Sequence, residues 1–412
     1  MVSPEAKKLA EERAARMQAA LDLKEPDRVP FTGLGGDVIP AYAGITSYEY
    51  EFDFEKNRQA AVKWFTDFPS DSAPRVGLGG LDNQSMGVAF QDYPEIVSGV
   101  NSVNGPMNDV LKMKFVRFPG RELDENSARQ FIGGKNMEPE EYDQLIADPV
   151  KFCFEVIMPR ISGGLKDLGS PASLATMARF GLEKARQDAE MAKTMQALME
   201  LGYYFAPRGV CLAPLDLISD QLRDIPNLIL DLRRYPDKVK AAAEALVEPM
   251  VKMGTMSIKA GAKECFIPLH LNEYLSPKQY NEFYWPTLKE VILKLVEAGM
   301  KVQVFFEGWH DAHLETILEL PAGWGTAYFE KTDVRKAKKL LQGHTCIMGG
   351  IDVSDIISLT PAQLDENIKK LFDEMAPGGG FIFSPNIGTC PRETPIENVR
   401  AVYEAVEKYG KY

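Results

Sequence analysis

The sequence has little of several features that define common protein classes. Five cysteines occur in 412 residues, at positions 153, 211, 265, 346 and 390, and no Cys-x-x-Cys pair is present. A scattered, odd set of this kind argues against a disulfide framework and favours a reducing, cytoplasmic location. No apolar run approaches the length of a membrane span, and the first residues predict a helix rather than a signal peptide.

Positive charge is also scarce. The net charge is −12, and no cluster of lysine and arginine stands out, so nucleic acid and anionic membranes are not expected partners. The glycine-rich stretches at residues 33–36 and 77–80 lack the lysine of a phosphate-binding loop and predict turns. A Gly-x-Ser-x-Gly elbow is absent as well, which argues against a nucleophilic hydrolase.

The second half of the chain alternates strongly between two patterns. Short apolar runs predict strands at residues 264–270, 301–307, 325–330, 345–351 and 380–384. Amphipathic stretches between them predict helices, and repeated strand–helix units favour a parallel sheet with right-handed crossovers. We therefore expect a (β/α)8 barrel with N-terminal helical and loop additions, with a doubly wound sheet as the alternative.

The same patterns predict one domain over residues 1–412. Residues 1–200 would hold the N-terminal additions and the first barrel units, and residues 201–412 the regular units. A helix should begin at Ser3-Pro4 and end near residue 23, followed by a short strand at residues 27–32. From residue 33 to about residue 137 the sequence predicts mainly loops.

Three polar residues end three consecutive predicted strands: His270, Glu307 and Glu330. In a parallel barrel, side chains at these positions converge on one mouth. One imidazole and two carboxylates form a suitable zinc site with an open position for substrate or water. The alternative is that each side chain hydrogen-bonds a neighbouring loop. His310 is a second candidate ligand, since it follows Glu307 by three residues.

Three further residues are candidate substrate contacts. Tyr203 and Tyr204 precede the loop at residues 206–209, and Asn386 follows the last predicted strand and is expected to face the pocket.

Several motifs together resemble the uroporphyrinogen decarboxylase superfamily. They occur in the order expected for that family, at residues 26–30, 333–338, 347–352, 378–383 and 394–400. The resemblance is strong after about residue 237 and weak between residues 33 and 201. It implies a barrel enzyme, and because family members are often dimers it also allows a homodimer.

Within this superfamily, the sequence departs from two known branches. The arginine-rich N-terminal motif of the decarboxylase is absent at residues 32–37, and a substrate bearing many carboxylates would need such cations. The thiol-activating methyltransferases ligate zinc through a His-x-Cys pair and a later cysteine. Here the corresponding positions are Phe305, Glu307 and about Ile387, so methylation of coenzyme M is not expected.

The remaining motifs, at residues 270–277, 306–308 and 329–333, resemble the branch that demethylates methyl donors such as methoxylated aromatics. The resemblance implies methyl transfer from an O-methyl group to the cob(I)alamin of a separate corrinoid protein. Zinc held by His270, Glu307 and Glu330 would act as Lewis acid, with His270 and Glu307 as the catalytic pair. The alternatives are a metal-free, decarboxylase-like lyase that uses Asp37 or Asp216, and a protein that only binds a tetrapyrrole or corrinoid.

Overall fold

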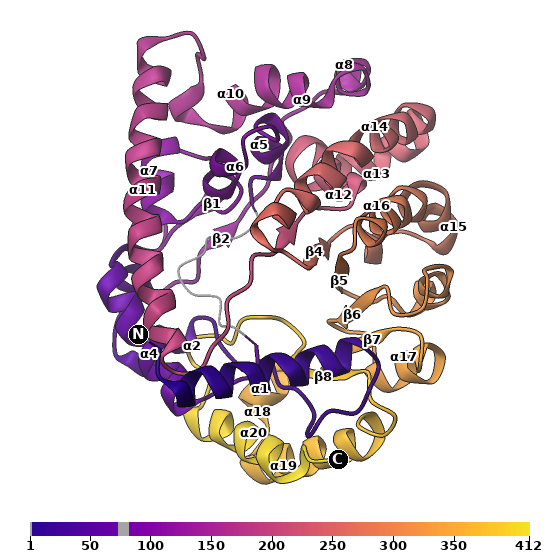
Figure 1. Ribbon diagram of the computed structural model, residues 1–412. Coiled ribbons are helices and arrows are strands. Elements are labelled where there is room, and N and C mark those ends of the chain that lie inside the picture. Colours follow the sequence, from indigo (N-terminus) through magenta and orange to yellow (C-terminus); the bar gives the residue numbers. More distant parts are fainter. Residues whose placement is uncertain (1, 73–81) are drawn as a thin grey trace. The chain divides into compact units, whose positions relative to one another are not determined.

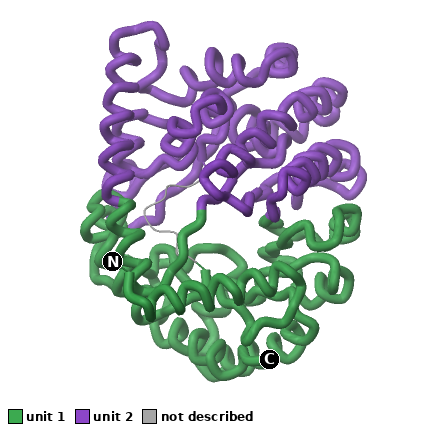
Figure 2. Tube along the Cα trace, in the orientation of Figure 1, with its two compact units in different colours: residues 1–76, 191–206, 303–412 green, residues 77–190, 207–302 purple. Residues whose placement is uncertain are grey.

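The computed structural model describes residues 2–72 and 82–412 (Figure 1). The turn predicted at residues 77–80 therefore lies outside the described residues. By its internal contacts the chain divides into two compact units (Figure 2). Unit 1 comprises Met1–Val76, Met191–Ala206 and Gln303–Tyr412, and unit 2 comprises Gly77–Glu190 and Pro207–Val302. Sequence patterns did not predict this division. No helix among the described residues is long and apolar enough to cross a membrane.

The parallel strands follow one another along the chain. β3 (Gly209–Val210) and β4 (Glu264–Leu269) pair in unit 2, whereas β6 (Gly325–Phe329), β7 (Cys346–Ile351) and β8 (Phe381–Pro385) pair in unit 1. β5 (Lys301–Phe306) begins at the end of unit 2 and continues into unit 1. The sheet order β3-β4-β5-β6-β7-β8 matches the sequence order, as repeated strand–helix units require.

Unit 1 surrounds its strands with helices whose starts are encoded locally. Ser3 accepts a hydrogen bond from the Ala6 amide, and Thr360 forms a capping box with Gln363. The helices are α1 (Pro4–Leu21), α2 (Val38–Ala43), α3 (Ser47–Phe52), α4 (Phe54–Asp67), η8 (Asp311–Glu319), α17 (Val334–Leu341), α18 (Val353–Ser358), α19 (Pro361–Met375) and α20 (Ile396–Tyr409).

The core of unit 1 joins the first helix to the last strands. Ala20 and Leu21 of α1 pack with Tyr328, Cys346, Met348 and Ile382 from β6, β7 and β8. The strand predicted at residues 27–32 is reduced to isolated bridges. Phe31 pairs in parallel with Phe383, so this segment lies beside β8 and continues the series of parallel neighbours.

Unit 2 consists mostly of helices. Those before β3 are α5 (Gln84–Ala89), α6 (Pro94–Val100), α7 (Gly105–Leu111), η1 (Pro139–Glu141), α8 (Tyr142–Ala147), α9 (Pro149–Phe152), η2 (Cys153–Ile157), α10 (Met158–Ile161) and η3 (Gly163–Leu165). α11 (Pro171–Met199) continues into unit 1, and β1 (Val116–Arg117) and β2 (Gln130–Phe131) form a small antiparallel pair.

After β3 come α12 (Pro214–Leu217), η4 (Ile218–Arg223), α13 (Ile225–Arg234), α14 (Pro236–Thr255) and η5 (Ile258–Ala260). After β4 come η6 (Asn272–Tyr274), α15 (Pro277–Gln279), η7 (Tyr280–Tyr284) and α16 (Trp285–Glu297). Three elements of unit 2, namely η2, η4 and η7, are π-helical turns. Such turns occur often at functional sites.

The prediction of mainly loops between residues 33 and 137 is wrong. Helices α2 to α7 lie within this stretch, and most are six or seven residues long. Helices this short show little periodicity, and their stability comes from packing against the rest of the protein rather than from their own sequence.

Candidate functional site

His270 is the first residue after β4 and is oriented by a carboxylate. Its Nδ1 atom lies 2.5 Å from Oδ2 of Asp220. A neutral imidazole that donates its Nδ1 hydrogen in this way has its lone pair on Nε2. The contact therefore fixes both the ring orientation and the tautomer, and it makes Nε2 the nitrogen suited to bind a metal or accept a proton.

Asp220 belongs to the segment that follows β3, and so does a second buried carboxylate. Asp216 lies on α12 and Asp220 on the π-helical turn η4, four residues later in the chain. Asp220 contacts the His270 ring, while Asp216 accepts hydrogen bonds from the amides of His270 at 3.3 Å and Leu271 at 3.0 Å. The two carboxylates thus hold the side chain and the backbone at the end of β4.

Asp216 is fully buried and also accepts a 2.6 Å hydrogen bond from the Tyr284 hydroxyl. Burial raises the pKa of Asp216 to about 7, and the nearby Asp220 carboxylate adds to this rise. Burial and the Asp216 carboxylate likewise hold the pKa of Tyr284 well above its usual range. The site therefore contains a carboxyl group that exchanges its proton near neutral pH.

The start of α5 lies against the same segment. The Ser85 amide donates a 2.7 Å hydrogen bond to Oε1 of Gln221, the residue after Asp220. Asp82 pairs with Arg129 at 2.8 Å, and burial raises the pKa of Asp82 despite this cation. Sequence patterns missed this segment, although four consecutive polar residues after a glycine-rich stretch are a recognisable signal at 82–85.

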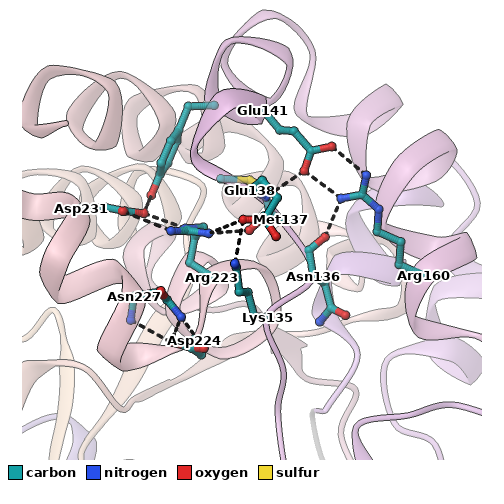
Figure 3. A network of polar contacts seen from close by, with 11 residues as sticks. Lys135, Asn136, Met137, Glu138, Glu141, Arg160, Arg223, Asp224, Asn227 and Asp231 are labelled. Atoms are coloured by element: carbon teal, nitrogen blue, oxygen red, sulfur yellow. Dashed lines mark hydrogen bonds and ion pairs between the residues drawn. The ribbon is translucent and has the colours of Figure 1, made fainter. Parts of the chain in front are cut away.

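A buried ion pair anchors the far end of η4 (Figure 3). The Arg223 guanidinium donates to both carboxylate oxygens of Asp231, at 2.6 and 3.1 Å, and to the Met137 carbonyl at 2.6 Å. Tyr142 donates a further hydrogen bond to Asp231, and the Met137 amide donates to the Leu222 carbonyl. This network fixes the turn on which Asp220 lies.

Glu307 and Glu330 lie in unit 1 and are brought together at one pair of strand ends. Glu330 follows β6, and its Oε2 accepts a 2.6 Å hydrogen bond from the Gly308 amide, in the turn after β5. Glu307 is the residue before that glycine and is partly buried. Thus the structure groups the two predicted carboxylates in unit 1, and it groups His270 with Asp216 and Asp220 in unit 2.

The predicted substrate contacts lie in different surroundings. Tyr203 is buried, and its hydroxyl accepts a hydrogen bond from the Ser70 amide. Oδ1 of Asn386 accepts hydrogen bonds from the amides of Val353 and Ile387, whereas Tyr204 is exposed. Tyr203 and Asn386 therefore have structural contacts, and a role of these three residues in substrate binding stays a prediction.

His310 and His313 are both buried in unit 1. The His310 ring lies 4.2 Å from the ring of Phe306, and burial, with His313 nearby, holds the pKa of His310 well below its usual range. The sequence pattern of residues 311–319 predicts His313 on a helix surface, and its burial shows that this prediction is wrong. Outside residues 1 and 73–81, no group of three or more histidine, cysteine or acidic side chains is positioned to hold a metal ion.

Enzymes built from β/α units place their active sites at the C-terminal ends of the parallel strands, and the titratable groups described above lie at such ends. The sequence matches the uroporphyrinogen decarboxylase (URO-D) family over residues 168–409, which is more than half of the chain. The protein therefore belongs to the URO-D family.

Two sets of relatives complete the comparison. Uroporphyrinogen decarboxylases of Idiomarina loihiensis and Coxiella burnetii are 23% identical over 177 residues and 25% identical over 183 residues, covering 42% and 43% of this chain. The chain spans about half the length of these curated relatives, 49% and 50% respectively. A methyltransferase from Methanosarcina mazei superposes with a TM-score of 0.61 at 14% identity, covering 96% of this chain and 98% of that one. This match confirms the predicted (β/α)8 fold class.

Proposed function

We propose that this protein is a methyltransferase that takes the methyl group of an aromatic methyl ether and passes it to the reduced corrinoid of a partner protein. Zinc, bound by His270, Glu307 and Glu330, would serve as Lewis acid. The observation that most supports this proposal is the His270–Asp220 contact of 2.5 Å at the end of β4.

The fit to a metal rests on the chemistry of these side chains. Histidines that ligate metals usually donate their second ring nitrogen to a carboxylate, as His270 does to Asp220. Glutamate oxygens at Glu307 and Glu330 would complete a nitrogen and oxygen ligand set suited to zinc. When bound, zinc would polarise the ether oxygen and stabilise the leaving phenolate, which is otherwise too basic to leave readily.

The residues of the chain would have defined tasks in the transfer. The bond between the donor's oxygen and its methyl carbon breaks, and the methyl group moves to the cobalt, whose reduced form supplies both bonding electrons. The oxygen keeps the electron pair of the broken bond and needs a proton to become a phenol. Asp216, with a pKa of about 7, is a carboxyl that can supply this proton near neutral pH.

The raised pKa of Asp216 also favours a second candidate, a metal-free lyase. In such a reaction a carbon–carbon bond breaks, carbon dioxide leaves, and a protonated carboxyl returns a proton to the carbon. Asp216 would be that acid, and the curated relatives are named decarboxylases. Asp37, the other candidate from sequence, lies in unit 1 at the start of α2.

Metal content separates the two candidates. We would measure zinc in the purified wild type, in Glu307→Ala and in Glu315→Ala, a matched control because Glu315 is exposed on η8 beyond the same strand. About one zinc per chain, lost only in Glu307→Ala, would support the methyltransferase and lead to assays with methoxylated aromatics and reduced cobalamin. No zinc in the wild type, even after zinc is supplied, would overturn it in favour of the lyase.

A further inference from the structure

Three consecutive side chains at the start of α5 are fully buried and make no hydrogen bond within the part of the chain that the structure describes. Asn83, Gln84 and Ser85 have no exposed surface. Among the described residues, none of the polar side-chain atoms of these residues has a hydrogen-bond partner, and this includes both the oxygen and the nitrogen of each amide. Buried polar groups are nearly always paired, because leaving one unpaired destabilises the fold. The absence of partners for the side-chain amides of Asn83 and Gln84 among the described residues therefore needs an explanation.

Two other buried asparagines in this chain, Asn398 and Asn104, are paired in the ordinary way. Nδ2 of Asn398 donates to the carbonyls of Ile356 and Leu359, at 2.7 and 2.8 Å. Oδ1 of Asn104 accepts a hydrogen bond from the Met107 amide at 3.1 Å. The amide oxygen of Asn101 also lacks a partner among the described residues, but in Asn83 and Gln84 both the oxygen and the nitrogen of the amide lack one.

Their position connects them to the residues that orient His270. The backbone amide of Ser85 donates to Oε1 of Gln221, and Asp220, the residue before Gln221, contacts the His270 ring. All of these residues belong to unit 2. The amides of Asn83 and Gln84 are therefore connected to the Asp220 carboxylate through the neighbouring Ser85 and its hydrogen bond to Gln221.

We propose that Asn83 and Gln84 determine substrate specificity by binding a neutral hydrogen-bonding substituent of the methyl donor, such as a hydroxyl or a carboxamide group. This inference rests on the proposed function and adds to it the chemical class of the donor's second substituent. This inference is based on the finding that, within residues 2–72 and 82–412, each amide lacks both a donor for its oxygen and an acceptor for its nitrogen.

A hydroxyl or carboxamide group can both donate and accept, so it can pair with both atoms of an amide. A carboxylate only accepts. It could pair with Nδ2 of Asn83 and Nε2 of Gln84 but would leave both amide oxygens unpaired and facing a negative charge. The two amides thus select against an ionised acid and in favour of a neutral polar group.

The test compares three ligands that differ in one substituent: ortho-methoxyphenol, ortho-methoxybenzoate and methoxybenzene. Their affinities would be measured by calorimetry on the zinc-supplied protein without corrinoid, below the pKa of the phenol. We expect wild type to bind the methoxyphenol at least about ten-fold more tightly than either of the others. Gln84→Met, which keeps the shape of the side chain, should remove this preference.

Thermal unfolding of the ligand-free variants provides an independent readout. Gln84→Met and Asn83→Leu each replace an unpaired buried amide by an apolar side chain, so Tm should rise by about 2 °C. Asn398→Leu, the matched control, breaks two hydrogen bonds and should lower Tm. A structural role for Asn83 and Gln84 predicts the opposite sign in their variants.

The outcomes separate this inference from the function on which it rests. Equal affinity for all three ligands, or a preference that survives in Gln84→Met, would overturn the role of the amides while leaving the aromatic donor in place. A fall in Tm for both amide variants would also overturn it. If wild type binds none of the three compounds, both the donor class and the specificity role are wrong.

Discussion

Replacing Arg223 by methionine should destabilise the protein more than any surface change, because it breaks a buried ion pair from one side. The side chains of Arg223 and Asp231 are each 3% exposed. Without the guanidinium, the Asp231 carboxylate keeps the hydrogen bond from Tyr142 but loses its cation and becomes an uncompensated buried charge. Removing one partner of such a pair costs about 3–5 kcal/mol of unfolding free energy.

Urea unfolding followed by circular dichroism would measure this loss. The double variant Arg223→Met with Asp231→Leu removes both charges and should regain most of the lost stability, because no ion is left without a partner. Arg160→Met is the matched control: Arg160 pairs with Glu141 at 2.7 Å but is 41% exposed, so its loss should cost less than about 1 kcal/mol. A loss below about 1 kcal/mol for Arg223→Met, or a double variant no more stable than the single one, would refute the reasoning.

Three further predictions concern the site. Asp220→Asn should keep the fold and weaken zinc binding by about 10–100-fold, measured by competition with a chelating dye; unchanged affinity would contradict the role given to the His270–Asp220 contact. Glu330→Gln should retain the Gly308 hydrogen bond through its amide oxygen and still lose zinc, whereas full zinc content would show that its charge is not needed. The Asp216 carboxyl has a folded pKa of about 7 against 3.8 when unperturbed, so the folded state binds its proton more tightly. Its stabilising contribution is present below pH 3.8 and is lost as pH rises through 7; Asp216→Asn should remove this decline in unfolding free energy, and an unchanged pH profile would count against the burial argument.

Much of the fold could be predicted because its signals are local and repeated. β4, β5, β6, β7 and β8 each begin and end within two residues of the apolar runs that predicted them. The helices α17, α19 and α20 follow the same rule, since Asp333, Thr360 and Pro395 mark their starts. Buried parallel strands leave a continuous apolar run that is easily recognised.

The site could be predicted only in part. His270, Glu307 and Glu330 are visible in the sequence because they end apolar runs. Asp220 and Tyr284 are not, since both lie on π-helical turns, whose spacing matches no regular periodicity. The pairing of Asp220 with His270 joins residues 50 positions apart, and no local pattern reports such a contact.

Because Asp220 lies on the π-helical turn η4, the geometry of the site depends on the number of residues between Asp216 and Asp220 as well as on their identity. A π-helical turn closes its hydrogen bond over one residue more than an α-helical turn does. Deleting one residue between Asp216 and Asp220 would restore ordinary helical spacing and rotate the following side chains by about 100° around the helix axis. The aspartate would remain in the sequence but would no longer face His270. Among related chains, a one-residue gap in this stretch is therefore expected to mark loss of the histidine–carboxylate pair, even where both residues are conserved.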